Sequence, residues 1–381
     1  MMYKYNYSPG PTYVRENVRA ARSLETTNPD IDRDFVKYYK DTCDIINKII
    51  DSNNNTYMLS GEAILGLEAA CASLTESGDR ILVIDNGLYG NGFKDFVSMY
   101  GGLPVMFKQD YKRGVSCEEL EEFLKRDSDF KYATIVHCDT PTGVLNDIHK
   151  ICPLLKKYGI MSVVDSVSGM VGEFLSVNKS GADIVIGGSQ KAISAQPGIT
   201  IVSVSDMASE SMRKREKPII GFYANLRIWE NYLSEQYFPY TLPSSDIISL
   251  RVALENIVSE GIDNVLDRHK KIATCVRSSI EKSGLRLFLE SDFSNTVTAI
   301  ELPDNIRATD ITRFIYEKHG VIIATSLAEY KDKIIRIGHM GENATFDRTS
   351  YILSLLDEAF AHYGVHLDET LFDGFVKNYK K

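Results

Sequence analysis

Short apolar segments alternate with helical periodicity between about residue 56 and residue 205, and this pattern constrains the fold most. Strand-length apolar runs recur at intervals, and stretches with a helical period lie between or just before them. Such alternation is typical of a mostly parallel sheet with helices on both faces, where ligands bind beyond the carboxyl ends of the strands. The expected strands are 81–84, 105–107, 133–136, 162–164, 184–186 and 200–204, and the expected helices are 62–73, 92–100, 117–125 and 148–158.

A long helical pattern follows, from residue 247 to residue 280, and its length is sufficient to connect two domains. Beyond it, expected strands at 296–300, 321–324 and 334–337 alternate with helical segments, as in a small α/β domain. We therefore expect an N-terminal arm over residues 1–20, a large domain over 21–261 and a small domain over 262–381. The arm holds the irregular segment Ser8-Pro9-Gly10-Pro11-Thr12, which must pack against other residues to be ordered.

The composition argues against several functional classes. The 381 residues include 52 acidic and 43 basic side chains, and the net charge of -9 lacks the positive field that nucleic acids and anionic membranes attract. The first residues lack a signal-peptide core, and no window reaches the roughly 18 apolar residues of a membrane helix. Six scattered cysteines and seven histidines show no metal-ligand spacing. We expect a cytoplasmic protein with reduced thiols, no metal, no nucleic-acid partner and no membrane span.

Two charged residues follow apolar runs in the strand-rich region. Lys191 comes after the run 184–186, among small residues that leave room around its amine, and Asp165 ends the run 161–164. A lysine amine forms a Schiff base with a carbonyl group, and a carboxylate beside a pyridine nitrogen keeps that nitrogen protonated so that the ring accepts electrons. A lysine after a strand is usually a solvated surface residue, and aspartate is common in turns, so either residue alone is weak evidence. Together they indicate a pyridoxal phosphate site.

Five motifs carry a resemblance that covers nearly the whole chain. They are Ser189-Gln190-Lys191-Ala192 with Pro197-Gly198, Asp165-Ser166-Val167-Ser168, the segment 137–143, Asn86-Gly87-Leu88-Tyr89-Gly90, and Ile335-Arg336-Ile337-Gly338. Together they resemble the class V aminotransferases of fold type I, and most closely the alanine–glyoxylate and serine–pyruvate branch. The resemblance implies an aspartate aminotransferase-like α/β fold, with a mostly parallel seven-stranded sheet in a large domain and a smaller C-terminal α/β domain. It also implies pyridoxal 5'-phosphate as cofactor and a homodimer with shared active sites.

The same resemblance assigns roles to residues around the cofactor ring. Lys191 would carry the cofactor and act as general acid and base, and Asp165 would pair with the pyridine nitrogen. Tyr89 matches an aromatic residue that stacks on the ring, where close relatives often carry Trp or Phe; a half-buried loop aromatic is the alternative. Thr140 lies where the family places a hydroxyl near the phenolic oxygen of the ring. His137 is as compatible with a structural histidine as with a site role, so we do not include it.

The expected phosphate site combines backbone N–H groups at a helix start with nearby polar donors. Gly61, Glu62 and Ala63 precede a helix, and Gln190 lies beside the lysine and adds a donor. Relatives commonly have Ser or Thr where this chain has Glu62, and a carboxylate there repels a phosphate if it points inward. We therefore expect the backbone N–H groups of Glu62 and Ala63 to bind, with the Glu62 side chain turned away.

A further donor to the phosphate is expected from the neighbouring subunit. Thr241, in the segment Pro239-Tyr240-Thr241-Leu242-Pro243, matches a threonine that crosses the dimer interface in the family. Relatives carry Tyr three residues before it, where this chain has Phe238. Whether Tyr240 supplies the hydroxyl instead stays open.

Arg336 is the expected substrate-binding residue. It lies in an apolar strand pattern, where a guanidinium either reaches solvent or meets an anion, and its planar fork fits a carboxylate. The family uses this arginine for the substrate α-carboxylate; a structural salt bridge is the alternative. The resemblance thus implies a transaminase that moves an amino group from a small amino acid, such as alanine or serine, to a small 2-oxo acid, such as glyoxylate or pyruvate.

Other functions remain open at this point. 2-Aminoethylphosphonate–pyruvate and ureidoglycine–glyoxylate transamination depend on side-chain contacts that the sequence does not reveal. A cysteine desulfurase-like lyase requires a nucleophilic cysteine on a loop of the small domain, and no cysteine follows Cys275. A cofactor-binding regulator usually carries an added DNA-binding domain, for which residues 1 to about 20 are too few.

Overall fold

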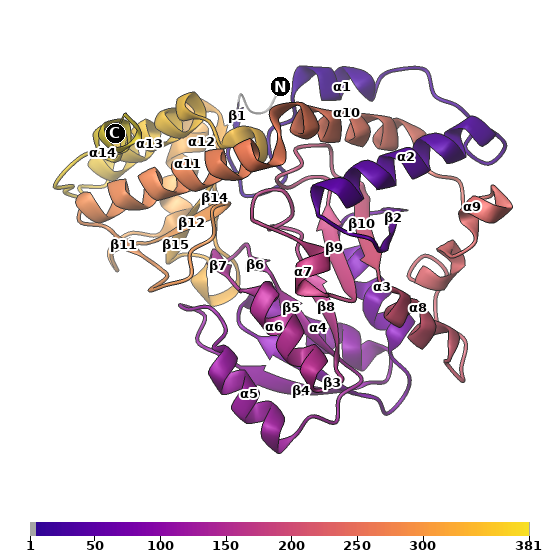
Figure 1. Ribbon diagram of the computed structural model, residues 1–381. Coiled ribbons are helices and arrows are strands. Elements are labelled where there is room, and N and C mark those ends of the chain that lie inside the picture. Colours follow the sequence, from indigo (N-terminus) through magenta and orange to yellow (C-terminus); the bar gives the residue numbers. More distant parts are fainter. Residues whose placement is uncertain (1–4, 381) are drawn as a thin grey trace.

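The structure is a computed structural model that describes residues 5–380. Its largest element is a seven-stranded sheet with the strand order β2, β10, β9, β8, β5, β3, β4 (Figure 1). Strand β10 is antiparallel to both of its neighbours, and the other neighbouring pairs are parallel. The expected mostly parallel seven-stranded sheet is therefore confirmed. Its strands are β2 (Asn55–Ser60), β3 (Arg80–Asp85), β4 (Leu103–Lys108), β5 (Tyr132–Val136), β8 (Met161–Asp165), β9 (Ile184–Gly188) and β10 (Ile199–Val204).

Helices connect these strands, and the four that the sequence predicts are present. They begin and end within four residues of the expected limits; buried residues recur on one side of α4, α5 and α6, whereas α3 is buried on nearly all sides. A short two-stranded ribbon lies beyond the carboxyl end of β5. The elements are α3 (Ile64–Leu74), α4 (Leu88–Met99), α5 (Cys117–Arg126), α6 (Ile148–Lys157), α7 (Val177–Ser180), α8 (Asp206–Arg213), β6 (Cys138–Asp139) and β7 (Val144–Leu145).

Two longer elements were not predicted, β2 and the helix α2 (Arg33–Ile49), and neither were the short elements α7, α8, β6 and β7. The polar segment before β2, Asp51-Ser52-Asn53-Asn54, is typical of a turn, and for this reason the strand that follows it was not predicted. In α2 charged residues are interspersed among the apolar ones, yet Phe35, Tyr39 and Ile46 are buried at helical spacing. Asp32 caps this helix, since its carboxylate accepts from the N–H groups of the first turn.

The long helix expected from residue 247 to residue 280 is in fact two helices, α10 (Ser244–Glu260) and α11 (Ile262–Lys282). They are separated by Gly261, whose φ of 87° lies outside the helical region and is readily adopted only by glycine. The apolar period continues across the break, which is why the sequence pattern does not reveal it. In Figure 1 the two helices lie end to end, with α11 over the C-terminal part and α10 over the large sheet.

The C-terminal part is built on an antiparallel four-stranded sheet with the order β11, β12, β15, β14. It has its own apolar cluster, formed mainly with the helices that follow α11. The strand expected at 321–324 is divided between two sheets, because β13 pairs with the arm and β14 pairs with β15. The elements are β11 (Arg286–Leu287), β12 (Val297–Glu301), α12 (Ala308–His319), β13 (Val321–Ile322), β14 (Ala324–Thr325), β15 (Ile334–Gly338), α13 (Phe346–His362) and α14 (Leu371–Tyr379).

The N-terminal arm packs against both parts. Strand β1 (Tyr5–Asn6) pairs with β13, while the backbone N–H of Thr12 donates to the carbonyl of Gln190 at 3.0 Å. Helix α1 (Glu16–Ala21) follows. Residues 1–4 of the expected arm lie outside the described residues, and the domain limits at 20, 261 and 262 stay predictions. A last short helix, α9 (Tyr232–Glu235), lies in the irregular segment before α10.

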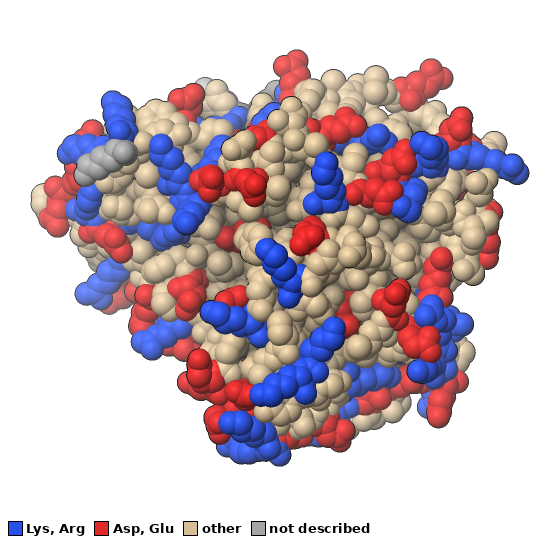
Figure 2. All heavy atoms as spheres, in the orientation of Figure 1, with Lys and Arg blue, Asp and Glu red and all other residues tan. Residues whose placement is uncertain are grey.

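Charges are spread over the face seen in Figure 2, where basic and acidic side chains alternate without a large region of one sign. Among residues 5–380, no helix is both long enough and apolar enough to cross a membrane. In the same residues, no group of three or more His, Cys, Asp or Glu side chains is placed to hold a metal ion.

Candidate active site

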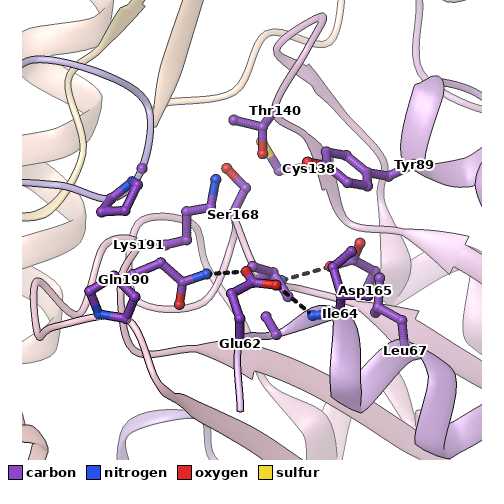
Figure 3. A pocket seen from close by; sticks show the side chains of 15 residues that line it. Glu62, Ile64, Leu67, Tyr89, Cys138, Thr140, Asp165, Ser168, Gln190 and Lys191 are labelled. Carbon is purple, nitrogen blue, oxygen red and sulfur yellow. Dashed lines mark hydrogen bonds between the residues drawn. The ribbon is translucent and has the colours of Figure 1, made fainter. Parts of the chain in front are cut away.

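A cavity of about 280 Å³ opens at the carboxyl edge of the large sheet. Parallel strands end at the same edge, so the loops after β5, β8 and β9 converge there, together with the starts of α3 and α4 and the N-terminal arm (Figure 3). Of the predicted site residues, seven line this cavity and three do not. The lining residues are Gly10, Pro11, Glu62, Ala63, Ile64, Leu67, Tyr89, Cys138, Thr140, Asp165, Val167, Ser168, Gln190, Lys191 and Pro197.

Lys191 points into the cavity from the turn that follows β9, where its Nζ donates to the carbonyl of Pro9 at 2.9 Å. Burial, and after it the positive charge of Arg336, lower the pKa of this amine to about 8, while Asp165 acts in the opposite direction. An amine with such a pKa is partly neutral near physiological pH. Lys191 therefore has the nucleophilic form that attack on an aldehyde requires.

Asp165 ends β8, and its Oδ1 accepts from the backbone N–H of Val167 at 2.9 Å. The side chain is buried, and burial raises the pKa of this carboxyl to about 7. A cationic ring nitrogen beside it would favour the ionised form again, because opposite charges stabilise each other in a poorly hydrated site. The carboxyl is thus placed to hold a protonated heterocycle.

Tyr89 presents its ring to the cavity from the first turn of α4, and its backbone N–H donates to Oδ1 of Asp139 at 3.0 Å. The preceding Gly87 has a φ of 148°, and a Cβ there would lie 2.4 Å from Cγ of Asp139. Only glycine allows this close approach, so the turn that orients the Tyr89 ring depends on it. Thr140 follows Asp139 and lines the same wall.

Eight lining residues were not among the predicted ones, and the two polar residues of these eight, Cys138 and Ser168, belong to the motifs described above. Cys138 directly follows His137, and the buried hydroxyl of Ser168 has no hydrogen-bond partner in the described chain. Their positions just after β5 and β8 are the signal that could have found them. His137 itself does not line this cavity: it pairs with Oγ of Ser166 at 2.9 Å, and burial lowers its pKa to about 3.

Arg336 lies on β15 beside the cavity wall rather than in the lining. Only 8% of the residue is exposed; its Nε donates to the carbonyl of Thr325 at 2.8 Å and its Nη1 to that of Thr140 at 3.2 Å. Within residues 5–380 no carboxylate pairs with it, so the structural salt bridge considered as an alternative is absent. A buried guanidinium bonded to carbonyl groups alone retains its capacity for an anion.

The start of α3 departs from the expectation for Glu62. Its side chain is not turned away: Oε2 accepts from the N–H of Ile64 at 3.0 Å, and Oε1 accepts from Nε2 of Gln190 (Figure 3). The helix start offers positive N–H groups, and the carboxylate is drawn to them as any anion is. Gly61 does not line the cavity, and its N–H donates to the carbonyl of Gly198 at 2.8 Å.

Thr241 and Tyr240 lie away from the cavity of this chain. The exposed Thr241 donates through Oγ1 to Oδ2 of Asp30 at 2.6 Å. The ring of Tyr240 packs on that of Tyr223, with centroids 4.4 Å apart, and its buried hydroxyl has no partner within residues 5–380. A contribution of Thr241 to a neighbouring subunit stays a prediction.

Comparison with known proteins gives the class of enzyme. The family model "Aminotransferase class-V" matches residues 10–327, and the chain therefore belongs to the class V aminotransferases, which are pyridoxal phosphate-dependent transferases. A pyridoxamine–pyruvate transaminase of Mesorhizobium japonicum is 31% identical over 83% of this chain and 81% of its own. An alanine–glyoxylate aminotransferase of Drosophila melanogaster is 30% identical over 81% and 79%. The crystal structure of pyridoxamine-pyruvate aminotransferase from Mesorhizobium loti superimposes with a TM-score of 0.94 at 28% identity, covering 100% of this chain and 98% of its own.

The residues of the cavity fit one part of that cofactor better than another. The amine of Lys191 suits the aldehyde of the cofactor, and the buried carboxyl of Asp165 suits its pyridine nitrogen. The ring of Tyr89 suits the face of the pyridine ring. The end at α3 differs, because the carboxylate of Glu62 occupies the helix start where an anionic phosphate is expected. The ring therefore fits, whereas a phosphate at the start of α3 would meet the Glu62 carboxylate.

Proposed function

We propose that this aminotransferase moves an amino group from a small amino acid, alanine or serine, to a small 2-oxo acid, glyoxylate or pyruvate. The observation that carries the proposal is the buried guanidinium of Arg336, which has no carboxylate partner in the described chain and bonds to Thr140 at the cavity wall. Amino acids and 2-oxo acids share one group, the α-carboxylate, which the planar fork of an arginine binds bidentately. The cavity of about 280 Å³ favours small side chains once the ring is in place.

Each assigned residue has a separate task. Lys191 would hold the ring at its aldehyde carbon, and its amine would carry the proton that leaves the substrate Cα. Asp165 would keep the ring nitrogen protonated, Tyr89 would cover one face of the ring, and Thr140 would offer a hydroxyl to its phenolic oxygen. The bound ring supplies an electron sink for the pair left at the substrate Cα when that proton is removed.

We propose a homodimer in the cytoplasm as the working form. Ile220, Phe222, Tyr223 and Tyr237 are more than half exposed, although they are large and apolar. Phe222 and Tyr223 contact Tyr240, the residue before Thr241. A second copy of the chain on this surface would cover these residues and bring Thr241 toward the partner's cavity. All six cysteines are free thiols, which supports a reducing compartment.

A second candidate takes pyridoxamine as the amino donor and pyruvate as the acceptor, as the name of the Mesorhizobium relative states for that protein. The Glu62 carboxylate at the start of α3 favours this candidate, because its negative charge repels a phosphate group. Pyridoxal phosphate carries that group, and pyridoxamine does not. 2-Aminoethylphosphonate–pyruvate and ureidoglycine–glyoxylate transamination have no such supporting contact here. A lyase of the cysteine desulfurase type lacks its cysteine, since none follows Cys275.

The test is a single-turnover experiment in two halves. Protein loaded with pyridoxal phosphate, or with pyridoxal, is mixed with alanine, serine or a control amine, and conversion of the ring to its amine form is followed by absorbance. Glyoxylate or pyruvate should then reverse the change and yield glycine or alanine. Lys191→Ala should fail in both halves, because proton transfer requires the amine. Ring conversion with no reversal by any 2-oxo acid would contradict transamination.

A further inference from the structure

The Glu62 carboxylate is fixed at the α3 end of the cavity by two bonds. Its Oε2 accepts from the N–H of Ile64 in the first helical turn, and its Oε1 accepts from Nε2 of Gln190, a residue 128 positions further along the chain (Figure 3). Gln190 is only 2% exposed. The carboxylate therefore cannot leave the cavity without breaking both contacts and leaving a buried amide donor unpaired.

Both polar groups at this end offer acceptors to a ligand. The amide Nε2 of Gln190 donates to the Glu62 carboxylate, which leaves the amide oxygen, Oε1 of Gln190, for a ligand. This buried oxygen has no hydrogen-bond partner in the described chain. The oxygens of Glu62 have further lone pairs. A phosphate ester offers only acceptors and carries about -1.5 to -2 charges at neutral pH, whereas an alcohol offers a donor and no charge.

Several donors near the start of α3 are already engaged, whereas the N–H groups of Glu62 and Ala63 bond to no residue of the described chain and lie beside the Glu62 carboxylate. The N–H of Gly61 donates to Gly198, that of Leu65 donates to the carbonyl of Glu62, and the hydroxyl of Thr200 donates to the carbonyls of Gly61 and Glu62 at 3.0 and 2.8 Å. Lys191 is the one basic side chain among the lining residues, and its Nζ bonds to Pro9. No cation of the described chain lines the α3 end of the cavity.

We propose that Glu62 and Gln190 make this end of the cavity a site for the hydroxymethyl group of an unphosphorylated pyridine ring, so that pyridoxal and pyridoxamine bind and their phosphate esters are rejected. The hydroxymethyl group donates its hydrogen to Glu62 or to Oε1 of Gln190. The proposal rests on the second candidate function and names the form of ring that the site takes.

In the corresponding reaction the ring is a substrate. The aminomethyl carbon of pyridoxamine is oxidised to the aldehyde of pyridoxal, and the carbonyl carbon of the 2-oxo acid is reduced to the amine-bearing carbon of an amino acid. The amino group and the carbonyl oxygen exchange places, and the proton removed from the aminomethyl carbon is delivered to the substrate Cα by the Lys191 amine. No external oxidant or reductant is needed.

The experiment measures binding rather than turnover. Protein freed of bound ring compounds is titrated with pyridoxal and with pyridoxal phosphate; absorbance gives each Kd, and borohydride followed by mass spectrometry shows whether the ring trapped on Lys191 carries phosphate. We expect pyridoxal to bind at least about tenfold more tightly, although the phosphate ester offers more atoms for contact. Glu62→Gln removes the charge and should reduce this preference at least about tenfold, and Glu62→Ser should reverse it.

Glu118→Gln is the matched control, because Glu118, like Glu62, is an exposed carboxylate near the start of a helix, here α5, but lies outside the cavity. It should leave the preference unchanged. Equal or tighter binding of pyridoxal phosphate by the wild-type protein would overturn the proposal, and this result needs no variant to fold. An unchanged preference in a folded Glu62→Gln protein would overturn the role of Glu62. Because the titration involves no 2-oxo acid, failure of transamination is read separately from failure of ring selection.

Discussion

At the scale of single residues, two buried charges lack a matching ion of opposite sign within hydrogen-bond distance. Arg336 is held by carbonyl groups, and the pKa of Asp165 is raised because burial outweighs its contacts. Both conditions cost stability in the protein without ligands and are relieved by a bound anion or cation. This is the expected arrangement of a site that a substrate completes.

The pKa of Lys191 leads to a prediction about pH. Capture of pyridoxal needs the neutral amine, so its rate should rise about tenfold per pH unit below pH 8 and level off above about 8, the lowered pKa of this lysine. Replacing Arg336 with Gln removes a positive neighbour, which raises the pKa and should move the midpoint to higher pH. Stopped-flow absorbance measures the profile. A midpoint near the ordinary value of 10.5 would show that the lysine is not enclosed.

Arg336→Ala should weaken binding of the amino acid and of the 2-oxo acid together. Loss of a charge-assisted pair in a buried site costs about 2 to 5 kcal/mol, or roughly 30-fold to several thousand-fold in apparent affinity. Arg336→Lys should rescue only part of this loss, because a point charge does not reproduce the fork. Single-turnover titrations of both half-reactions measure the effect. If Arg336→Ala keeps wild-type rates and affinities in both, the carboxylate is bound elsewhere.

At the scale of elements, the position of the site is set by the strand ends of the large sheet. A second feature at this scale is the break between α10 and α11, two helices that share one apolar period. Strands β5, β8 and β9 end at one edge because they are parallel, and each is followed by lining residues. The break depends on the backbone of one glycine. Its conformation, rather than the apolar pattern, ends α10.

Gly261→Ala should therefore destabilise the protein. A φ of 87° is unfavourable for a residue with a Cβ, and the cost is about 1–3 kcal/mol. Gly92 is the matched control: it lies within α4, where an added Cβ meets nothing within 4 Å, so Gly92→Ala should stabilise by about 0.5–1 kcal/mol. Urea unfolding followed by circular dichroism measures both. A neutral or stabilising Gly261→Ala would show that a continuous helix is acceptable at this position.

At the scale of the whole molecule, the arm and the large-sheet region line one cavity, and the C-terminal part places Arg336 beside its wall. Gly10 and Pro11 of the arm line it, and a Cβ on Gly10 would lie 2.4 Å from Cδ of Lys191. The arm is tied to the C-terminal part through β13 and to the lysine turn through Thr12. A shift of the arm relative to the C-terminal part or the lysine turn would therefore change how the Lys191 amine is enclosed.

The exposed apolar surface around Tyr237 leads to a prediction about assembly. Tyr237→Glu should shift the protein from dimer toward monomer in sedimentation experiments, because the charge would have to be buried in the interface. Monomers should also lose the bound ring on dilution if Thr241 completes the partner's site. Leu103→Glu, at an exposed apolar residue on β4, serves as control. A monodisperse wild-type monomer with full ring occupancy would refute the shared site.

The sequence alone determined the features that depend on local pattern. Apolar runs and helical periods located six strands of the large sheet, since each pattern reports which side of its own element is buried. Lys191 and Asp165 were recognisable because each follows a buried strand whose end must lie at the sheet edge. The helix pattern across Gly261 misled us, because periodicity does not report the φ of a single residue.

Only the tertiary structure decided which partner each polar side chain has. The direction of Glu62 depends on Gln190, 128 positions away, and the carbonyl groups around Arg336 come from the distant Thr140 and Thr325. No local pattern encodes such contacts, because they arise when the loops from different strands converge at one edge. The motifs therefore predicted an enzyme that binds a pyridine ring. The packing of Glu62 against the start of α3 determined which charge that ring compound meets in the cavity.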